Sequence, residues 1–191
     1  WTARHSEELK RGITIRLGYA DARLYRCRNH DPPLGYTTGE VCPICGGRTE
    51  FLRMVSFVDC PGHHSLMVTM LSGAALMDGA LFVIAADAKC PQAQDREHMI
   101  AAKIAEIENM IIIQNKVDVV SRERALENYE EIKMFLDEFG FKDKDVPIIP
   151  ISAQHKTNID VLIEAIEKYI PTPKRDPDSP PRMYILRSFD V

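Results

Sequence analysis

Hydrophobic residues along the chain follow two different periods, and the two kinds of segment alternate. Continuous apolar runs of strand length occupy residues 80–86, 110–114 and 146–151. Apolar positions recur at helical spacing in residues 64–77, 92–105, 121–139 and 158–169. Ser121 stands where it would cap the third of these helices. Buried strands separated by helices are typical of a parallel sheet covered on both faces, so the pattern predicts a doubly wound α/β fold.

Nearer its start the chain carries a different strand pattern. Residues 13–25 alternate apolar and polar positions at period two, as a strand with one exposed face does. Residues 48–59 fit as its antiparallel partner, and the cysteine-rich segment 27–47 connects the two. We therefore expect an antiparallel hairpin at the edge of a mainly parallel sheet.

The far end of the chain changes character. Residues 171–181 are too rich in proline to continue a helix or a strand, so they are expected to form a stiff linker. Residues 183–189 again resemble a strand. The expected organisation is one domain over residues 1–170, the linker 171–181, and the first strand of a following domain at residues 182–191.

Composition narrows the class of protein. The chain has 191 residues, of which 45% are hydrophobic and 27% are charged, as is ordinary for a globular domain. No apolar run reaches the roughly eighteen residues of a membrane span, so no membrane association is expected. The formal net charge of −4 argues against nucleic-acid binding by the whole surface. A basic cluster at residues 4–16 leaves open either a local contact or an ordinary solvated face.

The cysteines indicate a reducing compartment. They number five, and three of them fall within one short stretch, which fits a reduced intracellular protein better than a disulfide scaffold. The chain opens with Trp1 and shows no basic-then-apolar leader. We expect a cytoplasmic protein.

Two of the strand ends carry residues suited to a nucleotide. Asp59 ends one strand and could hold a magnesium ion, and Gly62 lets its backbone N–H approach a phosphate closely. After the strand at residues 110–114 comes Asn-Lys-Val-Asp, in which Asp118 could accept two hydrogen bonds from guanine. Adenine offers no such pair of donors. Asn115 would tie neighbouring loops together, and the Lys116 stem would lie over the base. Each segment could instead be an ordinary polar turn.

Two further segments are weaker when taken alone. Ser152, Ala153 and Gln154 follow the strand at residues 146–151, where small residues let backbone N–H groups reach the guanine oxygen, although an ordinary helix entry looks the same. Thr14 could supply a hydroxyl ligand to magnesium, or could simply be a β-branched strand residue.

In this order and spacing, the four segments resemble those of the translational GTPases such as elongation factor Tu. Residues 5–21, 55–63, 70–80 and 182–191 are similar, more specifically, to the gamma-subunit family of archaeal and eukaryotic translation initiation factor 2. That resemblance implies a P-loop GTPase fold with a β-barrel domain following it. It implies delivery of initiator methionyl-tRNA to the small ribosomal subunit in the GTP state. Alpha and beta subunits and a GTPase-activating partner are also implied.

The resemblance also implies roles for individual residues. Gly12 and Thr14 fall in the first switch and bear on magnesium, together with Asp59. Gly62 and His63 fall in the second switch, with His63 where the attacking water is positioned. Val117 belongs to the guanine-binding tetrad of residues 115–118.

The cysteine-rich connection has the spacing of a zinc site. Cys27-x-x-His30 and Cys42-x-x-Cys45 supply four ligands on two turns, as in tetrahedral structural zinc centres. The resembled gamma family usually carries four cysteines here, so His30 would replace one of them. The alternative is a flexible loop with free thiols.

One expected motif is missing. The sequence contains no Gly-x-x-x-x-Gly-Lys-Ser/Thr loop, the loop that grips the phosphates in this class of GTPase. In the resembled family it lies just upstream of Trp1, so we expect a domain that is incomplete at its start. Two alternatives stay open: another elongation-factor-type GTPase, and a fragment that binds partners without hydrolysing GTP.

Overall fold

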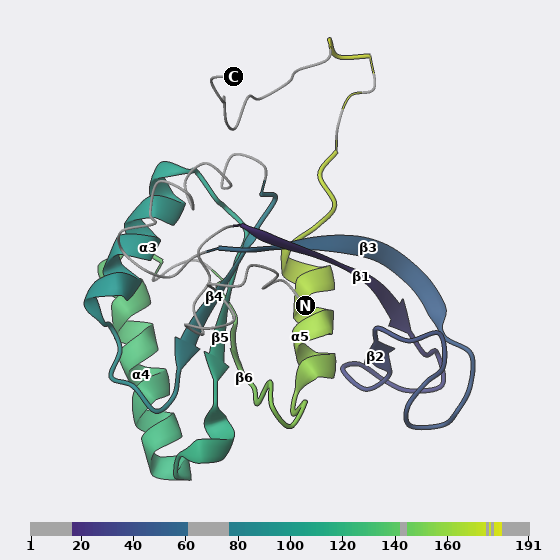
Figure 1. Cartoon of the computed structure of the whole chain (residues 1–191), viewed down its shortest axis with the longest axis horizontal. Helices are drawn as coiled ribbons and strands as arrows, with labels where there is room; N and C mark the ends of the chain where they lie inside the picture. The colour runs from purple at the N-terminus through teal and green to yellow at the C-terminus, as the bar shows by residue number, and fades with distance from the viewer. Residues whose placement is uncertain (1–16, 61–76, 142–144, 175, 177, 181–191) are drawn as a thin grey trace, which may run out of the picture.

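The computed structural model describes residues 17–60, 77–141, 145–174, 176 and 178–180. These residues form an α/β fold in which helices pack on both faces of a parallel sheet, with a long hairpin beside it (Figure 1). The predicted fold class is therefore confirmed. The predicted helix at residues 64–77 and the predicted strand at residues 183–189 lie outside the described residues.

The hairpin forms a small antiparallel sheet of its own. Strands β1 (Gly18–Arg26) and β3 (Glu50–Asp59) pair along their whole length, from Gly18 opposite Asp59 to Arg26 opposite Glu50. The short strand β2 (Tyr36–Thr37) pairs with the end of β1. The strand predicted at residues 13–25 is therefore present from Gly18 onward. Residues 13–16 lie outside the described residues.

The parallel sheet follows the predicted runs closely. Strands β4 (Ala80–Ala85), β5 (Met110–Asn115) and β6 (Ile148–Pro150) lie in the order β4-β5-β6. All pairs are parallel, with Ala85 in register with Asn115 at the carboxyl ends of the first two strands. β5 is central among these three strands, and its first five residues are buried, which explains its continuous apolar run.

Helices cover the two faces of this sheet. On one face, α3 (Ala93–Ile104) and α4 (Arg122–Glu138) build a core around Phe82, Ile112 and Phe135. On the other face, α5 (Ile159–Tyr169) packs against Ile111, Ile113 and, from the hairpin, Leu24. The predicted cap of α4 is confirmed: the Ser121 hydroxyl accepts a hydrogen bond from the Arg124 N–H.

The two sheets are separate within the part of the chain that the structure describes. No strand pair joins β3 to β4 there, and a cavity of about 930 Å³ lies between them. Residues of β3, the start of β4, α3 and the end of α5 line this cavity. Arg53 on β3 connects the hairpin to α5: its guanidinium donates to the Glu167 carboxylate at 2.7 Å and to the Ile166 carbonyl at 2.9 Å.

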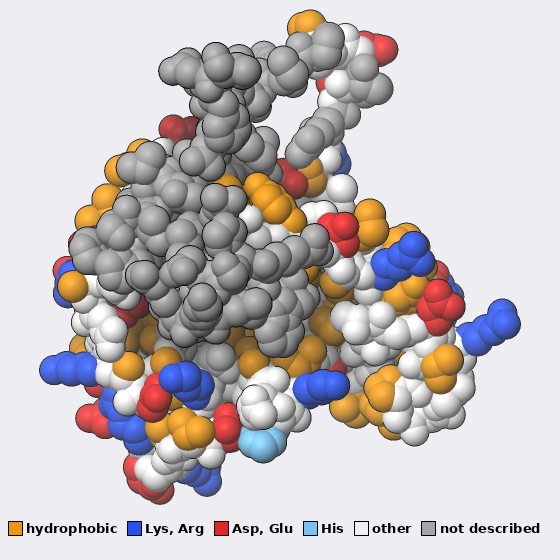
Figure 2. All heavy atoms as spheres, viewed as in Figure 1, with side chains coloured by type: hydrophobic (Ala, Val, Ile, Leu, Met, Phe, Trp, Pro, Cys, Tyr) orange, Lys and Arg blue, Asp and Glu red, His pale blue; other side chains and the backbone are white. Residues whose placement is uncertain are grey.

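The distribution of charged side chains on the surface agrees with the net charge of −4. On the face seen in Figure 2, acidic and basic side chains are interspersed over α4, and no basic patch dominates the coloured surface. Within the described ranges, no helix combines the length and the apolar character needed to cross a membrane. The basic cluster at residues 4–16 lies outside those ranges.

Candidate functional site

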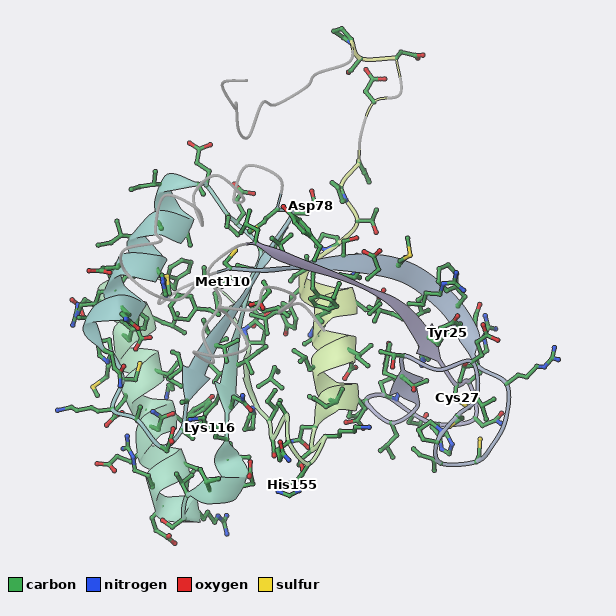
Figure 3. All side chains as sticks on the ribbon, in the orientation of Figure 1. Tyr25, Cys27, Asp78, Met110, Lys116 and His155 are labelled. Atoms are coloured by element: carbon green, nitrogen blue, oxygen red, sulfur yellow. The ribbon has the colours of Figure 1, made fainter. Side chains whose placement is uncertain are left out.

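The carboxyl ends of the parallel strands meet along one edge of the sheet. Figure 3 shows Lys116, just after β5, and His155, in the loop after β6, at this edge, with Met110 toward the opposite end of β5. In open α/β sheets, ligands bind beyond the carboxyl ends of the strands. Two of the sequence-predicted segments, residues 115–118 and 152–154, are therefore brought together at the expected place.

Asn115 joins two loops at this edge. Its Oδ1 atom accepts a hydrogen bond from the Lys116 N–H at 2.8 Å and another from the Ala153 N–H at 3.1 Å. The predicted tie between neighbouring loops is therefore present. The Ala153 N–H, one of the backbone donors of residues 152–154 expected near the guanine oxygen, donates to Asn115 in this structure.

Lys116 adopts an unusual backbone conformation. Its φ of 65° and ψ of 32° lie in the left-handed region, which is sparsely populated by residues other than glycine. The chain then enters a short 3₁₀ turn, η2 (Val117–Val119), whose first N–H donates to the Ile151 carbonyl at 3.3 Å. The Lys116 ammonium lies 3.2 Å from the Asp87 carboxylate, in the turn after β4. Backbone strain of this kind is concentrated at functional sites.

Asp118 is held as an ionised acceptor. The hydroxyl of Ser152, which is 1% exposed, hydrogen-bonds to its carboxylate, and this is the main reason that the pKa of Asp118 is lowered. His155 adds to the effect, since its Nε2 lies 3.6 Å from Asp118 Oδ2. The Asp118 side chain is 23% exposed, so a ligand can reach it. The site thus offers a fixed, partly accessible carboxylate of the kind that would accept two N–H donors.

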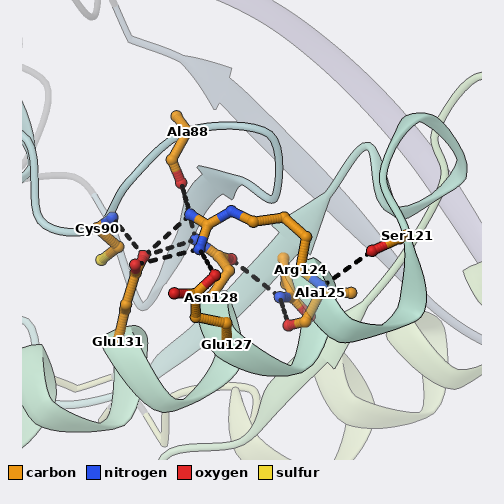
Figure 4. Close-up of polar contacts among 9 residues, drawn as sticks. Ala88, Cys90, Ser121, Arg124, Ala125, Glu127, Asn128 and Glu131 are labelled. Atoms are coloured by element: carbon orange, nitrogen blue, oxygen red, sulfur yellow. Dashed lines mark hydrogen bonds and ion pairs between the residues drawn. The ribbon is translucent and has the colours of Figure 1, made fainter.

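A buried polar network connects β5, α4 and the turn after β4, next to the carboxyl ends of the strands, and Figure 4 shows its contacts. Gln114, the one polar residue in the buried part of β5, donates to the Asn128 side chain at 2.9 Å. Asn128 and Arg124 both donate to the Ala88 carbonyl, at 3.0 and 2.9 Å. Glu131 accepts from Arg124 and from the Cys90 N–H. α4 therefore fixes the turn of residues 86–90 after β4.

Neither this network nor the Asp87–Lys116 pair was expected from the sequence. A polar glutamine within an otherwise apolar strand, at position 114, was the available indication that something buried would satisfy it. The partners on α4 could not be read from the sequence because they come from a different element.

The remaining predicted nucleotide residues are mostly outside the described ranges. Asp59 ends β3 and lines the cavity between the sheets. Gly12, Thr14, Gly62 and His63 lie outside the described residues, so their placement stays a prediction.

The predicted zinc ligands come together. The ligand atoms of Cys27, His30, Cys42 and Cys45 all lie within 4.8 Å of one another. Figure 3 places Cys27 at the far end of the hairpin, well away from Lys116. Tight turns build the cluster: the Cys27 N–H donates to the Gly35 carbonyl at 2.9 Å, and the Cys42 N–H donates to the Gly47 carbonyl at 2.8 Å. Gly35 has φ +91° and would crowd the Cys27 backbone with any side chain, so glycine is required there.

Several observations fit a zinc ion to these four residues. The Cys27 and Cys45 sulfurs are 3.7 Å apart, close to the edge of about 3.8 Å expected between two thiolates bound tetrahedrally at Zn–S distances of about 2.3 Å. Among the described residues, the buried His30 Nε2 atom makes no hydrogen bond of ordinary geometry, and the group with which His30 interacts is the Cys45 thiol, as expected of a nitrogen that shares a metal with that sulfur. The Gly47 N–H first, then His30 and Asn29, lower the pKa of Cys45 to about 6. A thiol so tuned is readily converted to the thiolate that zinc requires.

Comparison with known proteins identifies the family to which this domain belongs. The family profile of the elongation factor Tu GTP binding domain matches residues 2–172. Translation initiation factor 2 subunit gamma from Archaeoglobus fulgidus is 62% identical over 191 residues, which is all of this chain and 45% of that protein. The protein of the same name from Methanocaldococcus jannaschii is 59% identical over 192 residues, with 100% of the chain and 45% of the relative covered.

Among solved structures, the crystal structure of bacterial selenocysteine-specific elongation factor EF-Sec is similar, with a TM-score of 0.65 and 25% identity. That match covers 88% of this chain and 24% of the other. The chain spans less than half the length of the curated relatives that it matches. Together, the profile match, the strand-end geometry and these relatives show that the chain belongs to the elongation factor Tu GTP-binding domain family, alongside gamma subunits of archaeal translation initiation factor 2.

Proposed function

We propose that this chain is the guanine-nucleotide-binding part of a translation initiation factor 2 gamma subunit. The complete protein would bind initiator methionyl-tRNA in the GTP state, deliver it to the small ribosomal subunit, and hydrolyse GTP as a switch. The proposal rests on one observation above all: the loops after β5 and β6 are joined through Asn115, and they present the Asp118 carboxylate beside Ser152. The high identity to initiation factor gamma subunits supports the choice among translation factors.

The guanine base would be chosen by hydrogen-bond chemistry. Asp118 would accept from the N1–H and the exocyclic amino group of guanine, a donor pair that adenine lacks. The aliphatic part of Lys116 would cover one face of the base. Because Ser152 and His155 already orient the carboxylate, little ordering would be needed when the nucleotide arrives.

Phosphate binding and hydrolysis would involve other residues. Asp59 and Thr14 would hold magnesium, with Gly12 nearby, and the ion would neutralise charge on the phosphates. Gly62 would approach a phosphate oxygen, and His63 would position the attacking water. The phosphate-binding loop is not in this sequence, so we assign hydrolysis to the complete protein.

The cellular setting follows from the same proposal. The protein would act in the cytoplasm, with alpha and beta subunits and with a partner that activates hydrolysis. The similarity to a bacterial selenocysteine-specific elongation factor keeps another elongation-factor-type translational GTPase as the second candidate, but at 25% identity it is much the weaker match.

The test is nucleotide binding with a change of base preference. Fluorescent GDP is titrated, with magnesium, into this chain and into a version extended upstream through a phosphate-binding loop. We expect the extended version to bind, and GTP but not ATP to compete. Asp118→Asn should weaken GDP binding about 100-fold or more, because two hydrogen bonds to a charged acceptor are lost. The same variant should gain xanthosine diphosphate binding, since an amide N–H can donate to the xanthine 2-carbonyl.

Asp137→Asn, which changes an exposed acid on the outer face of α4, serves as the matched control and should leave both affinities unchanged. Absence of GDP binding by the extended protein would remove the guanine-site assignment, and the chain would then be better described as a partner-binding module.

We also propose that the cluster of Cys27, His30, Cys42 and Cys45 holds one structural zinc ion. Metal analysis of the purified chain should give close to one equivalent per chain, and Cys42→Ser should lose most of it. Cys60→Ser, which changes a cysteine outside the cluster, should retain it. Less than half an equivalent in the unmodified chain would rule the site out.

A further inference from the structure

We propose that Asp87 is a positioning residue of the guanine site, one that holds the Lys116 side chain where it can cover the base. This inference rests on the proposed function of residues 115–118. Asp87 follows β4 and Lys116 follows β5, and the two strands are in register at Ala85 and Asn115. The pair therefore lies side by side at the carboxyl edge of the sheet.

The contact connects two different loops across the strand ends. Lys116 Nζ lies 3.2 Å from Asp87 Oδ2, a distance at which an ammonium and a carboxylate form an ion pair. The backbone of Lys116 is fixed by its left-handed conformation and by the bond from its N–H to Asn115. Both ends of the side chain are thus restrained, so its aliphatic stem is held between the two loops, beside the proposed place of the base.

The turn that carries Asp87 is itself rigidly built. On one side, the Ala86 N–H donates to the Asn115 carbonyl at 2.8 Å. On the other side, the Ala88 carbonyl accepts from Asn128 and Arg124, as Figure 4 shows. Asn128 is fully buried, so the anchor belongs to the core rather than to the surface. A carboxylate presented from such a turn can fix a flexible lysine at small entropic cost.

An ordinary surface ion pair is the competing interpretation. The two side chains are 53% and 42% exposed, and exposed pairs contribute little to the stability of a folded protein. The two interpretations differ in what removal of the pair changes. A surface pair affects neither stability nor ligand binding to a large extent, whereas a positioning pair affects nucleotide affinity specifically.

The experiment measures GDP affinity and release rate in the version extended through a phosphate-binding loop. Asp87→Asn, which keeps the shape and removes the charge, should weaken GDP binding about three- to fivefold through faster release. Asp87→Glu should recover part of the affinity because it restores the charge. In a Lys116→Ala background, Asp87→Asn should have no further effect, since the partner is already gone.

A matched control is available on α4. Lys133 and Glu130 form an exposed pair of similar length, 3.1 Å, along one helix. Glu130→Gln removes the same kind of interaction away from the strand ends and should leave GDP affinity unchanged. Thermal midpoints of all variants identify any general loss of stability.

Each outcome decides the matter. If the parent binds GDP but Asp87→Asn binds equally well, the positioning role is wrong and the proposed function stands. A loss that persists undiminished in the Lys116→Ala background, or that accompanies an equal loss in Glu130→Gln, also refutes it. If the parent fails to bind GDP, the proposed function fails and the inference fails with it.

Discussion

Asn128 is the position at which a single truncation should be most informative about how the site is supported. Its side chain is fully buried on α4. Oδ1 accepts from Gln114 Nε2 at 2.9 Å, and Nδ2 donates to the Ala88 carbonyl at 3.0 Å. Asn128→Ala removes both bonds at once, together with a longer contact from Nδ2 to Glu131 Oε2 at 3.4 Å, and leaves a void where the amide group was.

The expected cost follows from these contacts. Each hydrogen bond contributes about 1 kcal/mol net, and the partners are not abandoned, because Gln114 retains the Ala125 carbonyl and Ala88 retains Arg124. The void adds a cavity term of about 1 kcal/mol. We therefore expect the free energy of unfolding to fall by about 2 to 3 kcal/mol, or the thermal midpoint by about 5 to 10 °C.

Urea unfolding of the 191-residue chain, followed by far-ultraviolet circular dichroism, measures this change. Leu126→Ala is the control on the same helix: the Leu126 side chain is 57% exposed, so its removal should cost less than about 0.5 kcal/mol. Amide hydrogen exchange should also become faster in residues 86–90 of Asn128→Ala, because their anchor is gone. A loss no larger than that of Leu126→Ala would show that the network does not hold the turn.

Three further predictions rest on other contacts. Ser152→Ala should raise the pKa of Asp118, because the hydroxyl that favours its ionised form is removed. Guanine binding needs the carboxylate and is lost as the pH falls through the folded-state pKa of Asp118, which lies below the ordinary value for aspartate. GDP affinity should therefore decline at a higher pH in the variant than in the parent, as titrations from about pH 6 down to about pH 3 would show. Burial first, and then nearby carboxylates, raise the pKa of Cys90 to about 12, so iodoacetamide at pH 8 should modify Cys90 only after unfolding. Rapid labelling of Cys90 itself in the folded chain, located by peptide mass spectrometry, would contradict this. Arg53→Met should speed amide exchange in β1 and β3 but not in β5, because the contact with Glu167 ties the hairpin to α5; equal exchange in variant and parent would refute that tie.

The sequence by itself determined the order and type of the main described elements, although it did not predict the short strand β2 or the 3₁₀ turn η2. The apolar runs became β4, β5 and β6, and the helical spacings became α3, α4 and α5, because burial of one face dictates the period of the hydrophobic residues. The hydroxyl cap at Ser121 was also predictable, since its partner lies three residues along the chain.

The same local rules identified the proposed zinc ligands as a set. Cys-x-x-His and Cys-x-x-Cys each fold within a single turn, so spacing alone brings each pair together. The Cys27–His30 pair lies beside the Cys42–Cys45 pair because β1 pairs with β3. That strand pairing brings together the two ends of the connection between β1 and β3, which carries all four residues.

Only the tertiary structure decided which loops touch. The bond from Ala153 to Asn115 joins residues that are far apart in the chain, as does the ion pair of Asp87 with Lys116. Both arise because parallel strands place their carboxyl ends at one edge, and the exact partners depend on strand register. Periodicity reports which face of an element is buried, but it carries no information about which side chain of another element lies opposite. For that physical reason the sequence could place residues 115–118 and 152–154 at the ends of neighbouring strands as candidates for the site, while Asp87 and the α4 network that supports it could not be predicted.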